Sequence, residues 1–252
     1  MNDRIVTIIP ARLASSRFPG KPLAPLLGRP VIEHVWRRAV LCAGIAETCV
    51  ATCDHEIREV VEGFGGQVIM TSPLHERASD RVAEAAEQLS ADIVVMVQGD
   101  EPLITPEMIL TALAPMLDDC AIDCANLIRR LHDGSEYLDR NTVKVVMNGN
   151  YDALYFSRSP IPLIDSSQLD IFPVYKQVCV IPFRRQFLAE FARLEPTPLE
   201  CAESIDMLRA LEHGRRVRLA ETQARTHAVD TPEDLQLVEV LMEQGMQTPM
   251  NS

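Results

Sequence analysis

The chain has 252 residues, with 36 acidic and 24 basic side chains, a formal net charge of −12 and 47% hydrophobic residues. This apolar content excludes a mainly disordered chain, and the length suits one large domain or two small ones. The negative charge argues against a nucleic-acid partner, because it repels an extended phosphate backbone unless basic residues are sharply clustered.

Short β-branched runs alternate with longer helical patterns through the first half of the chain. The run Ile5-Val6-Thr7-Ile8-Ile9 is typical of a buried strand. The predicted strands cover residues 4–9, 47–51, 67–70 and 92–97, and the predicted helices cover 30–42, 55–64, 80–89 and 106–117. The alternation predicts an α/β protein with right-handed βαβ units, in which a mostly parallel sheet carries helices on both faces.

The second half of the chain is less regular. The predicted strands cover residues 142–147, 153–156, 177–183 and 217–221, and the predicted helices cover 186–194, 200–213 and a segment that starts at Asp230. The proline-rich stretch 160–173 indicates a surface excursion, either a lid or a dimer arm. We expect one domain over 1–245, in which 142–185 forms part of a second substrate site and a dimer arm, followed by a loose tail at 246–252.

The seven cysteines form no C-x-x-C pair and no zinc-binding spacing, so we expect reduced thiols. The start of the chain lacks the features of a signal peptide. No apolar run approaches the ~20 residues that span a bilayer. We therefore expect a cytoplasmic protein without a membrane partner.

A local cluster of cations follows the first predicted strand. The segment from Pro10 to Leu23 carries Arg12, Arg17 and Lys21 among small residues. Ligands of open α/β sheets bind beyond the carboxyl ends of the strands, where backbone N–H groups and cations can hold phosphates. The alternative is a solvated basic loop. The spacing matches neither a dinucleotide-binding glycine motif nor a Walker motif.

Two carboxylates stand at the ends of predicted elements and are far apart in the sequence. Asp100 follows the apolar strand that ends at Val97, and Asp230 opens the last helix. Mg²⁺ in phosphate sites is commonly held by one or two protein carboxylates together with phosphates and water. The pair is therefore a candidate metal site. The alternatives are an acidic turn at Asp100 and a simple N-cap at Asp230.

Several fragments together resemble one enzyme family. I-I-P-A-R-x-x-S-x-R-x-P-G-K-P-L, V-x-V-Q-G-D-E-P, A-L-Y-F-S-R-S-P-I-P and V-D-T-P-E-D-L occur in order over residues 4–240 and are similar to the 3-deoxy-manno-octulosonate (Kdo) cytidylyltransferases. The resemblance implies a nucleotidyltransferase-type, Rossmann-like α/β fold. It also implies CTP and a sugar acid as substrates, Mg²⁺ as cofactor, CMP-sugar and pyrophosphate as products, and a homodimer.

The resemblance also implies roles for individual residues. The implied catalytic residues are Arg12, Lys21, Asp100 and Asp230, of which the two aspartates would hold Mg²⁺. The implied CTP-binding residues are Pro10, Ala11, Arg12, Lys21, Ala78, Ser79, Arg81, Gln98 and Gly99. The implied acceptor-binding residues are Gln98, Arg158, Gln177, Ile181, Asp206 and Met207.

Departures from the family pattern are concentrated on the acceptor side. The family's histidine and tyrosine are Gln177 and Ile181 here, and its Glu-Gln pair is Asp206-Met207. In the loop 77–81 an alanine replaces the family's glycine, which alters the contact expected for the base. A site built for hydroxyl groups discriminates strongly by its hydrogen-bond partners. We therefore expect the chain to act on Kdo or a close analogue, or on another acid such as an amino-Kdo or a small phosphonate. A third alternative is a catalytically silent nucleotide-binding protein.

Overall fold

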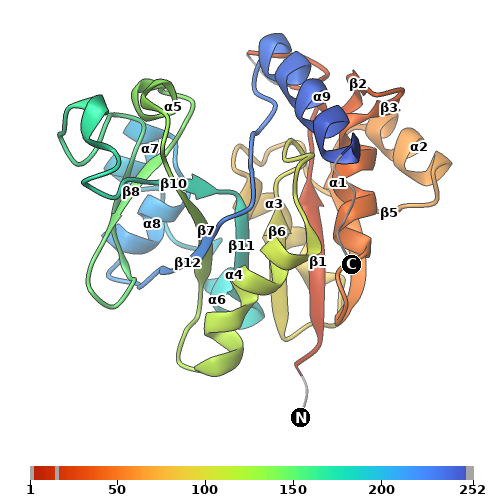
Figure 1. Ribbon diagram of the computed structural model, residues 1–252. Coiled ribbons are helices and arrows are strands. Elements are labelled where there is room, and N and C mark those ends of the chain that lie inside the picture. The colour runs from red at the N-terminus through yellow and green to blue at the C-terminus, as the bar shows by residue number, and fades with distance from the viewer. Residues whose placement is uncertain (1–2, 15–16, 248–252) are drawn as a thin grey trace.

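The computed structural model describes residues 3–14 and 17–247, and these residues form two five-stranded sheets and a small hairpin. The first sheet has the strand order β11-β6-β1-β4-β5. All of its pairings are parallel except that of β11 with β6. Its strands are β1 (Ile5–Pro10), β4 (Ile45–Thr52), β5 (Gln67–Met70), β6 (Ile93–Val97) and β11 (Val180–Arg184). The predicted mostly parallel sheet is confirmed (Figure 1).

Helices cover both faces of this sheet because successive side chains of its buried strands point to opposite sides. Ile5 and Ile9 of β1 pack with one set of helices, and Val6 and Ile8 pack with another. The first set is α1 (Val31–Val40), α2 (His55–Gly63) and α4 (Pro106–Asp118). The second set is α3 (Ala78–Glu87), α6 (Arg185–Phe191) and α8 (Met207–Glu212).

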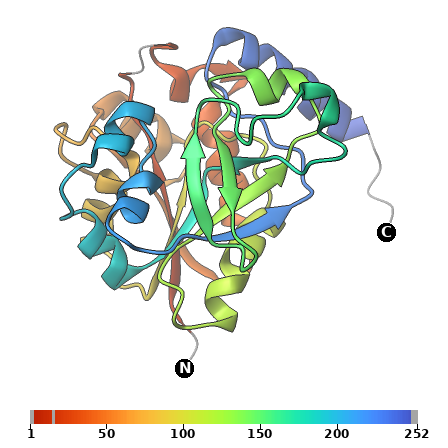
Figure 2. The ribbon, with the colours of Figure 1, turned by 90° about the vertical axis from the view of Figure 1, so that its left-hand side faces the viewer.

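The second sheet was not expected as a separate unit. It has the order β12-β7-β10-β8-β9, with antiparallel pairings except that of β12 with β7. Its strands are β7 (Ala125–Arg130), β8 (Lys144–Met147), β9 (Ala153–Ser157), β10 (Tyr175–Val178) and β12 (Arg218–Thr222). Figure 2 shows the green strands β8 and β9 facing the viewer. The strand β7 and the short helix α5 (Gly134–Leu138) were missed by the sequence patterns.

Two predicted elements are interrupted in the structure, and both breaks lie beside the cavity described in the next section. The strand expected over 177–183 is two strands, with β10 in the second sheet and β11 in the first, and Cys179 between them. The helix expected over 200–213 is divided into α7 (Pro198–Glu203) and α8, because Ser204 adopts a left-handed conformation with φ 56°.

The remaining elements close one end of the first sheet. Helix α9 (Pro232–Gln247) packs through Val238 and Met242 on Leu26 and Val31, beside the hairpin β2 (Pro25–Leu26) and β3 (Arg29–Pro30). Two 3-10 turns, η1 (Lys21–Leu23) and η2 (Ser166–Gln168), complete the described chain. The first two residues of the expected tail are helical, and 248–252 lie outside the described residues. Among the described helices, none has the length and apolar character that crossing a bilayer requires.

Candidate active site

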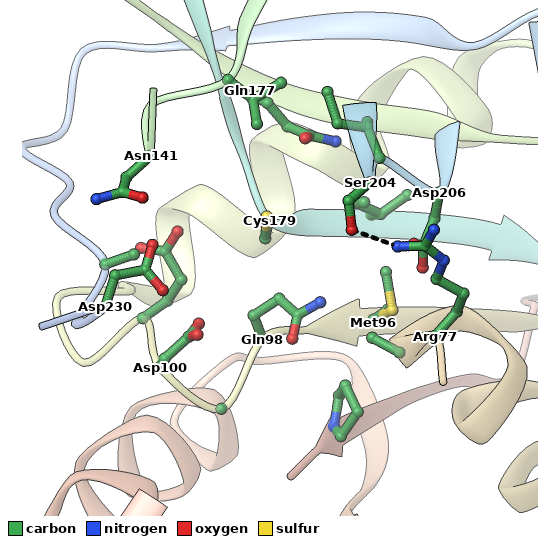
Figure 3. Close-up of a pocket in the computed structure, with 18 of the residues that line it drawn as sticks. Arg77, Met96, Gln98, Asp100, Asn141, Gln177, Cys179, Ser204, Asp206 and Asp230 are labelled. Atoms are coloured by element: carbon green, nitrogen blue, oxygen red, sulfur yellow. Dashed lines mark hydrogen bonds and ion pairs between the residues drawn. The ribbon is translucent and has the colours of Figure 1, made fainter. Parts of the chain in front are cut away.

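A cavity of about 480 Å³ opens at the carboxyl ends of β1 and β6, between the two sheets. Every site residue expected from the sequence lines it except Ser79. Figure 3 shows Asp100 and Asp230 together at one end, and Arg77, Ser204 and Asp206 at the other. The cavity thus has a carboxylate end and a second end formed around α8 and β10.

The loop after β1 is folded back on itself by its glycine. Gly20 has φ 74°, a left-handed conformation that glycine adopts without a steric penalty, and its N–H donates to the carbonyl of Leu13 (3.0 Å). The turn places Lys21 at the start of η1, where it is only 9% exposed. The local sequence therefore turns a lysine ammonium into the cavity instead of into solvent.

The ammonium of Lys21 joins the two candidate metal ligands. Its Nζ donates to Asp100 Oδ2 at 2.5 Å and to Asp230 Oδ1 at 3.1 Å, although these residues lie 79 and 209 positions away. Asp230 is brought there by a backbone bond from Val229 N to Asp100 O (2.8 Å). Burial alone lowers the pKa of Lys21, but the charges of both aspartates outweigh it and raise that pKa. The lysine stays protonated.

The two arginines of the loop differ in their contacts. Arg17 donates to Asp230 Oδ1 (2.9 Å) and to the side chain of Asn141, so it spans the carboxylate end. Arg12 is exposed and forms no hydrogen bond or ion pair within the described part of the chain. A free guanidinium beside a buried ammonium suits a multiply charged anion.

Gly99 allows the ends of β1 and β6 to approach each other. A Cβ atom at this position would lie 2.9 Å from the carbonyl oxygen of Pro10 and 3.0 Å from a methyl of Ile32. Only glycine fits without a shift of the backbone. The close approach keeps Gln98 and Asp100 directly beside the loop that carries Arg12 and Lys21.

The second end of the cavity has a largely apolar floor. Met96, Ile181 and Met207 line it and are at most 2% exposed. All three belong to the same hydrophobic cluster as the helices α3, α6 and α8. Gln98 and Gln177 contribute carboxamides from two different strand ends, and the half-buried Cys179 lies between the two ends (Figure 3).

Ser79 is fully buried and holds Asp206 in place. Its hydroxyl and its backbone N–H both donate to Asp206 Oδ2, at 2.7 and 3.2 Å. Burial raises the pKa of Asp206, and the hydrogen bonds from Ser79 and the charge of Arg77 oppose that rise. Arg77 itself donates to the Ser204 hydroxyl (2.6 Å; dashed in Figure 3). The structure thus gives Ser79 a contact to Asp206 and not to the cavity.

Arg158 lines the cavity, and each of its three guanidinium nitrogens already donates one hydrogen bond to a backbone carbonyl. The guanidinium donates to the carbonyl of Glu203 (2.7 Å), of Arg140 (3.1 Å) and of Ser204 (3.4 Å). These bonds tie the end of β9 to the break between α7 and α8. Arg158 therefore shapes the second end of the cavity through the backbone and offers it a positive charge.

Comparisons with known proteins agree on one family. The sequence family described as "Cytidylyltransferase" matches residues 6–220. A 3-deoxy-manno-octulosonate cytidylyltransferase of Geobacter metallireducens is 46% identical over 244 residues, which cover 93% of this chain and 96% of that protein. One of Myxococcus xanthus is 46% identical over 240 residues, covering 95% and 96%. The chain belongs to the 3-deoxy-manno-octulosonate cytidylyltransferase family.

Comparison with solved structures shows that this cytidylyltransferase also shares the fold of its family. A CMP:2-keto-3-deoxy-manno-octonic acid synthetase complexed with CTP has a TM-score of 0.87 and 42% identity, and the match covers 96% of this chain and 99% of that one. A 4-diphosphocytidyl-2C-methyl-D-erythritol synthase of Anaerococcus prevotii, 15% identical, has a TM-score of 0.64 and shares the fold. The expected nucleotidyltransferase-type fold is confirmed.

Several cavity residues of the cytidylyltransferase gave little or no signal in the sequence. Glu101, next to Asp100, is 5% exposed, and burial together with the charge of Asp100 raises its pKa to about 7. Glu101 lies within the motif V-x-V-Q-G-D-E-P and Arg77 begins the loop 77–81, so both could have been included on that ground. Ser204 lies two residues before the Asp206-Met207 pair and could have been included likewise, whereas Asn141 adjoins no motif and only the tertiary structure brings it to the cavity.

Proposed function

We propose that this cytidylyltransferase transfers CMP from CTP to Kdo or a closely similar sugar acid in a Mg²⁺-dependent reaction that releases pyrophosphate. The observation that carries the proposal is the contact of Lys21 with both Asp100 and Asp230 inside a cavity with a second, separate end. The proposal is supported by the acceptor named for the relatives and by the CTP bound in the similar structure.

The donor set at the carboxylate end fits Mg²⁺. Asp100 and Asp230 each place an oxygen within hydrogen-bond distance of one ammonium, so both oxygens lie near a common point. No group of three or more His, Cys, Asp or Glu side chains among the described residues could hold a metal. Two carboxylates with phosphates and waters are the set that Mg²⁺ prefers. Bound there, the ion would neutralise phosphate charge and favour departure of pyrophosphate.

The cations of the loop would hold the triphosphate in line for attack. In the reaction, an oxygen of the acid forms a bond to the α-phosphorus, the bond from that phosphorus to the bridging oxygen breaks, and the hydroxyl proton passes to solvent. Lys21 and Arg12 would bind the phosphate oxygens, and Arg17 would restrain the loop across Asp230. Little covalent help is needed, because positioning and charge neutralisation dominate phosphoryl transfer.

A different acid is the second candidate, and one observation favours it. Ile181 and Met207 put apolar surface on the cavity floor, so a hydroxyl of the acid that faced this floor would gain no hydrogen bond from it. An aminated octulosonate or a small phosphonate would satisfy the same CTP and metal end.

The test measures the release of pyrophosphate from CTP in the presence of Mg²⁺. Kdo, an amino-Kdo and small phosphonates are each assayed separately as the acid. Release with Kdo that needs both CTP and the metal supports the first candidate. Release only with another acid supports the second. No release with any acid, from a protein that binds CTP in calorimetry, rejects the proposed reaction. Asp100→Asn serves as the inactive control because it removes a proposed metal ligand.

We also propose that the enzyme forms a homodimer through the segment 142–185. This segment exposes apolar side chains, among them Leu154, Leu163, Ile171 and Phe172. Sedimentation should give twice the chain mass, and Leu163→Asp, a change at a side chain that is 94% exposed, should shift the protein toward the monomer. A monomeric wild type would reject the dimer.

A further inference from the structure

Gln177 presents an unpaired hydrogen-bond acceptor to the second end of the cavity. The residue is half-buried on β10 and lines the cavity (Figure 3). Its Nε2 donates to Asn126 Oδ1 at 2.6 Å. Its Oε1 has no partner among the residues that the structure describes. An amide oxygen can only accept, so at this point of the wall a ligand group can form a hydrogen bond only if it is a donor.

The orientation of the Gln177 carboxamide is fixed from behind by Asn126. Asn126 is fully buried on β7, and its Nδ2 donates to the carbonyls of Leu127 (2.7 Å) and Val178 (3.0 Å). Carbonyl oxygens only accept, so the amide nitrogen of Asn126 must face them and its Oδ1 must face Gln177. That oxygen in turn needs a donor, which sets Nε2 of Gln177 toward Asn126.

The sheet register brings the two side chains together. In the antiparallel pairing of β10 with β7, Gln177 lies opposite Ile128, and Asn126 is two residues further along β7. Residues two apart on a strand share a face, and diagonal neighbours across a pair are within reach of long side chains. The contact is therefore a consequence of the fold. The carbonyls of Leu127 and Val178, which fix Asn126, belong to the backbone, so their positions do not depend on side-chain rotamers.

We propose that Asn126 is a positioning residue that holds Gln177 Oε1 toward the acid substrate, and that the acid presents a hydroxyl or an ammonium at this point. The inference rests on the proposed function and specifies the acceptor of that same site. A keto, ether or carboxylate oxygen of the acid at this point would face Gln177 Oε1, and two acceptors cannot form a hydrogen bond with each other. Ile181 and Met207, which form the floor, offer no hydrogen bond, so the mismatch at Gln177 would cost affinity.

The test measures binding of the acid, so that it does not depend on turnover. Kdo, its monodeoxy analogues, and analogues in which one hydroxyl is replaced by an amine or by a methoxy group are titrated calorimetrically into protein that holds Mg²⁺ and a non-hydrolysable CTP analogue. Wild type should lose about tenfold in affinity when one particular hydroxyl is removed or methylated, the size of one hydrogen bond. An amine at that carbon should retain the affinity.

Two variants assign this selectivity to the Gln177–Asn126 pair. Gln177→Met, which keeps the length of the side chain, should bind the parent acid and that deoxy analogue equally. Asn126→Leu frees the Gln177 amide to reverse, so the methoxy analogue should recover affinity. CTP affinity should stay within about twofold in both variants, because the hydrogen bond that each variant affects is made to the acid and not to CTP. Gln67→Met, at the exposed start of β5, is the control.

The outcomes separate the inference from the proposed function. An unchanged analogue pattern in Gln177→Met overturns the inference while the proposed function stands. An unchanged pattern in a folded Asn126→Leu protein overturns the positioning role of Asn126. If that variant does not fold, Gln177→Met alone decides whether Gln177 Oε1 accepts a hydrogen bond from the acid. Wild-type protein that holds the CTP analogue but binds none of the acids rejects the proposed function and the inference together.

Discussion

Replacing Glu101 with glutamine should remove a pH-dependent penalty on the stability of this protein. Glu101 is 5% exposed, and its Oε2 has no hydrogen-bond partner among the described residues. Burial, reinforced by the charge of Asp100, raises the pKa of Glu101 from 4.5 to about 7. The folded protein therefore keeps a proton that the unfolded chain releases.

The sign and the size of the effect follow from this difference. Below about pH 4.5 both states are protonated at this group, and stability is unaffected. As the pH rises toward 7 the unfolded chain loses the proton first, so the free energy of unfolding falls. At about 1.4 kcal/mol per pH unit, the interval from 4.5 to about 7 corresponds to a loss of about 3 kcal/mol. Above that range the loss is constant.

Urea unfolding of the metal-free protein in EDTA, at several values between about pH 5 and pH 8, measures this difference. Because glutamine does not titrate, the free energy of unfolding of Glu101→Gln should improve relative to wild type by about 2 kcal/mol across that range. Glu59→Gln, an exposed position on α2, should show no such trend. A difference between Glu101→Gln and wild type that is flat with pH would refute the reasoning, because it would mean that Glu101 titrates alike in both states.

Three further predictions concern the loop cation, the buried ion pairs and the strand ends. Lys21→Met should slow pyrophosphate release about 100-fold or more, because it removes a preorganised cation from the reacting phosphates; a variant with the wild-type rate in a coupled assay would reject that role. Arg209→Met removes the partner at 2.7 Å from the fully buried carboxylate of Glu200 and leaves it only Arg77, at 3.5 Å, so it should cost about 3 kcal/mol in urea unfolding. Gly99→Ala places a Cβ atom 2.9 Å from the carbonyl oxygen of Pro10, and should cost about 1–3 kcal/mol and raise the KM for CTP. An unaltered midpoint and KM for this last variant would show that the strand ends can separate freely.

The sequence was sufficient where a pattern depends on neighbouring residues. Continuous apolar runs predicted β1 and β6, because strands buried on both faces need them. The strand expected over 67–70 has the bounds of β5. The sequence also predicted the edge of the sheet at which Lys21 and Asp100 lie, since the carboxyl ends of parallel strands share one edge. The family, its fold and its cytidylyl chemistry were therefore accessible before any coordinates.

The second end of the cavity depended on contacts between residues far apart in sequence. The segment 177–183 has the composition of one strand, and only its two partners, β7 and β6, decide that it divides at Cys179 between two sheets. The break at Ser204 is likewise met by a distant residue, because the guanidinium of Arg158 donates to the carbonyls of Glu203 and Ser204.

Sequence by itself thus indicated the carboxylate end of the cavity, because Lys21, Asp100 and Asp230 stand in compact motifs at the ends of predicted elements. Tertiary structure alone decided the partners of the residues at the second end, where Gln177 donates to Asn126 on another strand and Ser79 donates to Asp206 across 127 positions. The physical reason is that local propensity sets whether a segment is extended or helical. Which buried amide or carboxylate it meets is set by the pairing of distant strands.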